Sequence, residues 1–133
     1  MLASSERVAL ARTALRDVLA ALFCALFAFV YEQFSHGVWS AAMVFAFVWP
    51  LLGALPYLIA LAGRRDFQIA DGVSLLWHCG LASLTVGSLM NGALEIYGTT
   101  HPLLVVYPLA GGTLCAGAAV LQLMKQRHSA RQA

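Results

Sequence analysis

The sequence predicts an all-α membrane protein with four transmembrane helices, arranged as two antiparallel hairpins with both chain ends in the cytoplasm. Two features of composition predict the fold class. The chain has 133 residues, of which 61% are hydrophobic and 11% are charged. A soluble domain has about 25% charged residues, so a bilayer is the expected solvent. The apolar residues also gather into four stretches near the length of about 20 residues that a membrane-spanning helix needs.

The four predicted spans cover residues 18–34, 38–61, 72–97 and 103–124. Inside hydrocarbon each backbone N–H and C=O must be satisfied within its own segment, so each span is predicted to be a helix. A cytoplasmic segment at 1–17 precedes the first span, and a basic tail at 125–133 follows the last. The turns inside each pair of spans are short, which is typical of antiparallel neighbours.

Positive charge gives the predicted orientation. All eight Lys and Arg residues lie in the N-terminal segment, in the middle loop or in the C-terminal tail, and the turns around His36 and Thr100 have none. Cytoplasmic segments carry an excess of Lys and Arg, so both chain ends and the middle loop are expected inside the cell. The expected location is a plasma membrane, taken as a bacterial inner membrane, crossed four times.

The N-terminal residues have two interpretations. Arginines followed by an apolar run fit a cleaved signal peptide in outline. The run continues into Phe29-Val30-Tyr31-Glu32-Gln33 without a small-x-small cleavage site, which favours a retained helix. Residues 4–17 are expected to extend this helix or to lie along the membrane surface. There the arginines would anchor the topology or contact anionic lipid.

The two predicted hairpins show similar runs of sequence. Glu32 and Glu95 each lie near the end of a first helix, and the second helices carry Val48-Trp49-Pro50 and Val106-Tyr107-Pro108. Against a duplication, the spacing from Glu to Pro is 18 residues in the first half and 13 in the second. Both a duplication and a chance likeness remain open. The prolines are expected to bend their helices, because each removes a helical hydrogen bond.

Small residues indicate close helix packing. Ser83, Gly87 and Asn91 recur at four-residue spacing, as do Gly111, Cys115 and Ala119. Such patterns let backbones approach in lipid, which predicts a seam between the third and fourth helices or between protomers. The three cysteines each stand alone in apolar sequence, so neither a redox pair nor a zinc knuckle is indicated.

The main candidate site lies at the predicted outer side, where Glu32, Glu95, His36 and His101 are found. An ionisable residue in a membrane segment is costly and tends to face the protein interior or a wet cavity. Convergence of these four side chains would suit a transition metal. Without a metal they could bind a proton or an organic cation. The alternative is that the glutamates extend to water and the histidines are ordinary loop residues.

A second set of candidates lies along the third helix, where His78, Thr85, Ser88 and Glu95 fall on roughly one face with Asn91 at its edge. This face could line a polar path across the membrane, or it could hydrogen-bond to neighbouring helices. His78 beside Trp77 fits an anchor at the membrane interface, and the alternative is an axial haem ligand. A second histidine at the same depth is missing from the chain, which counts against haem.

Three functions follow from these patterns. The first is a transport or ligand-binding component with an outward-facing acidic, cation-binding site, acting as a homo-oligomer or within a larger complex. The second is a structural or accessory subunit of a larger membrane complex. The third is a redox subunit that binds a metal or haem. Membrane lipid is an expected partner, whereas nucleic acid is not, because there is no basic patch to hold it. The sequence shows no catalytic motif and does not identify a cofactor.

Overall fold

A computed structural model describes residues 4–63 and 69–132, and within these ranges the chain is all-helical. Four helical stretches in this part are long and apolar enough to cross a membrane: Ser4–Gln33, Ala41–Leu61, Asp71–Ile96 and Pro102–Gln132. The predicted fold class is confirmed to this extent. The middle loop, which the sequence places at residues 63–67 between the second and third predicted spans, lies mostly outside the described residues.

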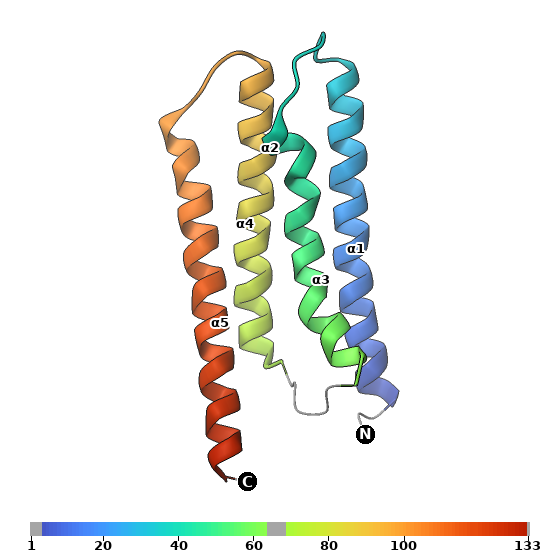
Figure 1. Cartoon of the computed structure of the whole chain (residues 1–133), viewed down its shortest axis with the longest axis vertical. Coiled ribbons are helices and arrows are strands. Elements are labelled where there is room, and N and C mark those ends of the chain that lie inside the picture. The colour runs from blue at the N-terminus through green and yellow to red at the C-terminus, as the bar shows by residue number, and fades with distance from the viewer. Residues whose placement is uncertain (1–3, 64–68, 133) are drawn as a thin grey trace.

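The elements follow one another as a row of helices. Helix α1 spans Ser4–Gln33, α2 spans Ala41–Val44, a 3-10 segment η1 spans Phe45–Phe47, and α3 spans Val48–Leu61. Helix α4 spans Asp71–Ile96, a second 3-10 segment η2 spans Pro102–Val105, and α5 spans Val106–Gln132. Helix α1 packs mainly on α3, and α5 packs mainly on α4 (Figure 1). The α1–α3 pair meets the α4–α5 pair where α2 and α3 pack on α4.

Helix α1 contacts its neighbours through one narrow face. Its buried residues recur at alternating spacings of three and four: Ala14, Asp17, Ala21, Cys24 and Ala28. This spacing places them along one side of a helix, and the small side chains let α3 approach closely. Asp17 is the one acidic residue among them, so the packing face carries a carboxyl group into the interior.

Helices α4 and α5 meet at glycines. A Cβ atom added at Gly80 would lie 2.5 Å from Cys115 Sγ, and one added at Gly111 would lie 2.7 Å from the carbonyl oxygen of Gly80. A Cβ at Gly87 would lie 2.5 Å from Tyr107 Cβ. The predicted small-residue seam is therefore confirmed at Gly87, Gly111 and Cys115. Position 119 differs, because the helix turns Ala118 to the interior and leaves Ala119 exposed.

Pro50 and Pro108 have matching positions, each the third residue of an α-helix that directly follows a 3-10 segment. Proline cannot donate the hydrogen bond to the fourth residue before it, which favours a change of helix type at that place over a simple bend. The extra residues of the first half lie in the connection at 34–40 and in α2. The unequal spacing from Glu to Pro thus has a local origin, and duplication stays a hypothesis.

Candidate functional site

Glu95, in the last turn of α4, is held by two neighbours. Its Oε2 accepts a hydrogen bond from Ser40 Oγ at 2.5 Å, and its Oε1 accepts one from Asn91 Nδ2 at 2.8 Å. Ser40 is 1% exposed and also caps α2 by accepting from the backbone N–H of Met43. The carboxylate of Glu95 is therefore fixed in direction, although the residue as a whole is exposed.

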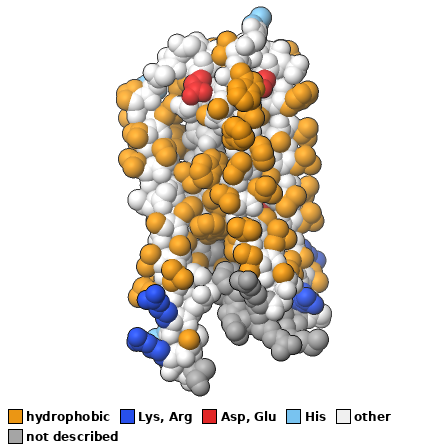
Figure 2. Space-filling model, viewed as in Figure 1, with side chains coloured by type: hydrophobic (Ala, Val, Ile, Leu, Met, Phe, Trp, Pro, Cys, Tyr) orange, Lys and Arg blue, Asp and Glu red, His pale blue; other side chains and the backbone are white. Residues whose placement is uncertain are grey.

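Glu32 lies one helical turn beyond Ala28, on the packing face of α1. It is half-buried, and its Oε1 atom is buried without a hydrogen-bond partner among the described residues. A buried carboxylate oxygen without a partner is costly, so this atom is suited to a cation or a hydrogen-bond donor. Near the end of the bundle opposite most Lys and Arg side chains, Figure 2 shows two acidic patches with apolar side chains between them.

The two other candidate residues near this end, His36 and His101, are both exposed. His36 is exposed in the turn after α1, with a left-handed backbone (φ 54°). His101 is exposed and caps η2, where its Nδ1 accepts a hydrogen bond from the backbone N–H of Leu103 at 3.3 Å. In the described ranges, no three His, Cys, Asp or Glu residues come together as metal ligands. The structure therefore does not bring Glu32, His36, Glu95 and His101 into one group.

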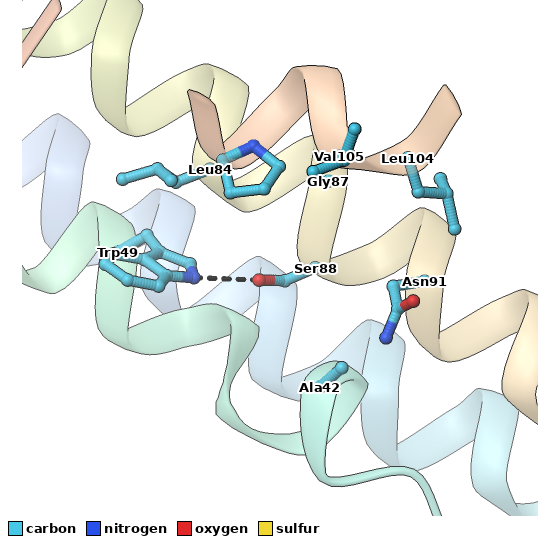
Figure 3. Close-up of a pocket in the computed structure, with 9 residues that line it drawn as sticks. Ala42, Trp49, Leu84, Gly87, Ser88, Asn91, Leu104 and Val105 are labelled. Atoms are coloured by element: carbon cyan, nitrogen blue, oxygen red, sulfur yellow. Dashed lines mark hydrogen bonds between the residues drawn. The ribbon is translucent and has the colours of Figure 1, made fainter. Parts of the chain in front are cut away.

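A cavity of about 300 Å³ opens beside Asn91, between α2, α3, α4, η2 and α5. Its polar lining comes from Trp49, Ser88 and Asn91, which Figure 3 shows together, with Trp49 donating to Ser88. The remaining lining residues are mostly apolar and come from these helices and the 3-10 segment: Ala42, Leu84, Gly87, Leu104, Val105 and Pro108. Asn91, which lines the cavity, also donates a hydrogen bond to Glu95, so the carboxylate contacts a residue of the cavity wall.

The Trp49 indole donates to Ser88 Oγ at 2.8 Å and so joins α3 to α4 beside the cavity. Replacing Ser88 by Ala is expected to cost about 0.6–1.7 kcal/mol of unfolding free energy, the range for interhelical hydrogen bonds in membranes. Trp49→Phe should cost a similar amount plus lost packing. The double variant should cost less than the sum of the two single variants, as measured by unfolding in mixed micelles. Strict additivity would show that the bond contributes nothing.

A second polar cluster lies nearer the basic end of the bundle. Asp17 Oδ2 of α1 lies 3.1 Å from His78 Nε2 of α4. His78 Nδ1 lies 2.8 Å from the carbonyl oxygen of Ser74, and the Ser74 hydroxyl bonds the hydroxyl of Tyr57 on α3. The Tyr57 and His78 rings also pack together, with centroids 5.5 Å apart. Three helices thus meet around one imidazole.

The polar face predicted on the third helix mostly makes interhelical bonds. His78 contacts α1, Ser88 contacts α3, and Glu95 contacts the residue before α2. Thr85 instead donates to the carbonyl oxygen of Leu81 in its own helix, at 2.8 Å. Both ring nitrogens of His78 have partners, so haem ligation would require one of these bonds to break. The arrangement favours helix joining over a continuous path.

The fold and the cavity define a small helical protein with four helices able to cross a membrane and with polar groups between them. Comparison of the chain with family models, with curated proteins and with solved structures gives no match. Asp17, Tyr57, Ser74 and Trp49 were not among the site residues expected from the sequence. For Asp17 a signal exists in the sequence, namely its place in the three-and-four spacing of small residues along α1.

Proposed function

We propose that this chain is a ligand-binding component of membrane transport that takes a small organic cation at the outward-facing half of the bundle. The proposed topology is two antiparallel hairpins in a plasma membrane, with both chain ends in the cytoplasm. Figure 2 supports this orientation, because Lys and Arg side chains lie near one end and the two acidic patches near the other.

The observation that carries the proposal is the cavity beside Asn91 and Glu95. An indole, an amide and apolar side chains line it, and a carboxylate with fixed direction stands next to it. An aromatic face attracts a cation through its quadrupole, and apolar walls accept the organic part of an ammonium ion. A volume of about 300 Å³ sets the scale of the ligand at a small molecule.

Charge at this end supports a cation over an anion. The Lys and Arg residues of the described chain lie in the first half of α1 and in the last turns of α5, far along the sequence from Glu32 and Glu95. In the chain segments around the two carboxylates, no positive side chain is available to neutralise their charge. The unpartnered Oε1 of Glu32 adds to the attraction for a cation.

The test compares two probes of the same shape against the purified full chain in lipid nanodiscs. Benzyltrimethylammonium carries a charge, and neopentylbenzene is its neutral counterpart. We expect the cation to bind with a heat measurable by titration calorimetry and the neutral probe to bind at least about tenfold more weakly. Glu95→Gln should weaken cation binding by about tenfold, equal to ~1.4 kcal/mol, and leave the neutral probe unchanged.

Asp71→Asn is the matched control, since Asp71 is exposed at the opposite end of the same helix. It should leave binding of both probes at the level of the parent. Equal binding of the charged and neutral probes would reject a cation site. Unchanged affinity in Glu95→Gln would reject the role of this carboxylate.

A second candidate function is that of a subunit docked through α5 in a homo-oligomer or a larger membrane complex. Helix α5 packs mainly on α4 and is the least covered of the four spans. Of the most apolar 18 residues in its span, 11% are buried, against 22–28% in the other three spans. Crosslinking of a single cysteine at Val120, which is exposed on α5, would capture a partner if this face is an interface. Labelling of the same cysteine by lipid-soluble reagents without any crosslink would place it in lipid.

A further inference from the structure

The Asp17–His78 cluster joins helices that stand on either side of α3 (Figure 1). Asp17 comes from α1, His78 and Ser74 come from α4, and Tyr57 covers the imidazole from α3. This cluster lies in the half of the bundle nearer the basic end, away from Glu95. The chemistry of the cluster is therefore independent of what the cavity binds.

The partner of His78 Nδ1 determines which nitrogen carries a proton. Ser74 offers its backbone carbonyl oxygen, which can only accept, at 2.8 Å. Nδ1 must therefore carry a proton and donate it. The neutral imidazole then has a lone pair on Nε2, and an ionised Asp17 has lone pairs on Oδ2. These two acceptors lie 3.1 Å apart, a distance at which a hydrogen bond needs one proton between them.

We propose that Asp17 and His78 form a binding site for a single proton, which joins α1 to α4 while it is bound. The proton is held either as imidazolium and carboxylate or as neutral imidazole and carboxylic acid, and both forms satisfy the hydrogen bond. When the proton leaves, a carboxylate faces a nitrogen lone pair in a poorly solvated place. The two groups then repel each other, and α1 and α4 separate at this level.

The surroundings give the pair room and access. A Cβ at Gly53 of α3 would lie 3.1 Å from Asp17 Oδ2, so the glycine leaves the space that the carboxyl group occupies. The side chain of Asp17 is 13% exposed and that of His78 is 31% exposed, so the pair is not sealed inside the bundle.

Among the residues that the structure describes, few other ionisable groups face the pair. Tyr57 packs on it from α3, and Asp71 lies in the first turn of α4. Helix α5 faces the other side of α4, where Cys115 lies against the carbonyl oxygen of Trp77. The proton is therefore shared between Asp17 and His78 themselves.

The first measurement uses the unaltered chain, with ¹⁵N-labelled histidine, in nanodiscs from pH 5 to pH 9. We expect the Nδ1 signal of His78 to stay in the protonated range throughout and the Nε2 signal to change in one step. The exposed His36, His101 and His128 serve as internal references. Loss of the proton from Nδ1 in place of Nε2 would overturn the proposal, and this result needs no variant.

The second measurement follows the melting temperature with pH. The parent is expected to lose about 2–8 °C between pH 6 and pH 9, because the contact is present while the proton is bound and is lost as pH rises. In Asp17→Asn the amide donates to the neutral Nε2 at either pH, so this fall should vanish. His128→Gln, which removes an exposed histidine of α5, should keep the fall of the parent. The same fall in Asp17→Asn as in the parent would overturn the proposal.

Discussion

Gly80→Ala is expected to separate α4 from α5 and to lower the free energy of unfolding by about 1–3 kcal/mol, the usual cost of overpacking. The added Cβ would lie 2.5 Å from Cys115 Sγ, 2.9 Å from the carbonyl oxygen of Gly111 and 3.0 Å from the backbone nitrogen of Cys115. Two of these atoms belong to the backbone of α5 and cannot rotate away. Helix α5 must therefore shift as a body, which lengthens every contact along the seam.

The control for this variant is Gly112→Ala, one position away from Gly111 on α5. A Cβ there would have nothing within 4 Å, so Gly112→Ala should keep the stability of the parent or slightly exceed it. Unfolding by denaturing detergent in mixed micelles measures both variants. Equal stability of Gly80→Ala and Gly112→Ala would show that the close approach at Gly80 does not exist.

Gly92→Ala is expected to displace α2 and with it Ser40, which donates a hydrogen bond to Glu95. The added Cβ would lie 2.5 Å from Met43 Cβ and 2.9 Å from the backbone nitrogen of Met43. Met43 is fully buried, and its N–H donates to Ser40 Oγ, the same hydroxyl that donates to Glu95. Moving Met43 therefore moves Ser40. We expect a loss of about 1–3 kcal/mol in stability together with a weaker affinity for benzyltrimethylammonium.

Gly117→Ala serves as its control, because a Cβ there meets nothing within 4 Å. It should leave both stability and probe affinity at the parent level. Full cation affinity in a folded Gly92→Ala variant would mean that Ser40 does not position Glu95. The affinity for benzyltrimethylammonium and a melting curve are measured on the same nanodisc sample. The melting curve shows whether the variant is folded, which separates a change in affinity from simple unfolding.

Much of the fold could be predicted because the bilayer leaves few alternatives. Long apolar stretches must be helices in hydrocarbon, and four such stretches are visible without any knowledge of contacts. Part of the α4–α5 seam was also predictable, since glycine and cysteine at four-residue spacing have the same meaning in any lipid-embedded helix. The longer first connection and the 3-10 segments were not, because proline shows where a hydrogen bond is lost but not how the backbone adapts.

The polar contacts were the harder part. Asp17 comes one residue after Arg16, just outside the predicted first span, where an acidic residue is usually solvated. Its burial depends on Gly53 and His78, which are 36 and 61 residues away in the chain. The pattern of charges in the sequence does not show which distant residues come into contact. Glu95 was predicted as a site residue, but its partner Ser40 was not. Ser40 lies in the loop before α2, where no sequence periodicity shows which way a side chain points.

The order of packing along the row has a consequence for how the protein is made. Helix α3 packs on α1, α4 packs on α2 and α3, and α5 packs on α4, so each later span finds its main partner among those already synthesised. A chain is synthesised from its N-terminal end, so its helices become available in this order. Assembly can therefore proceed during translation, with each newly inserted helix docking on a finished surface, and α5 is added last without rearrangement of the first three spans.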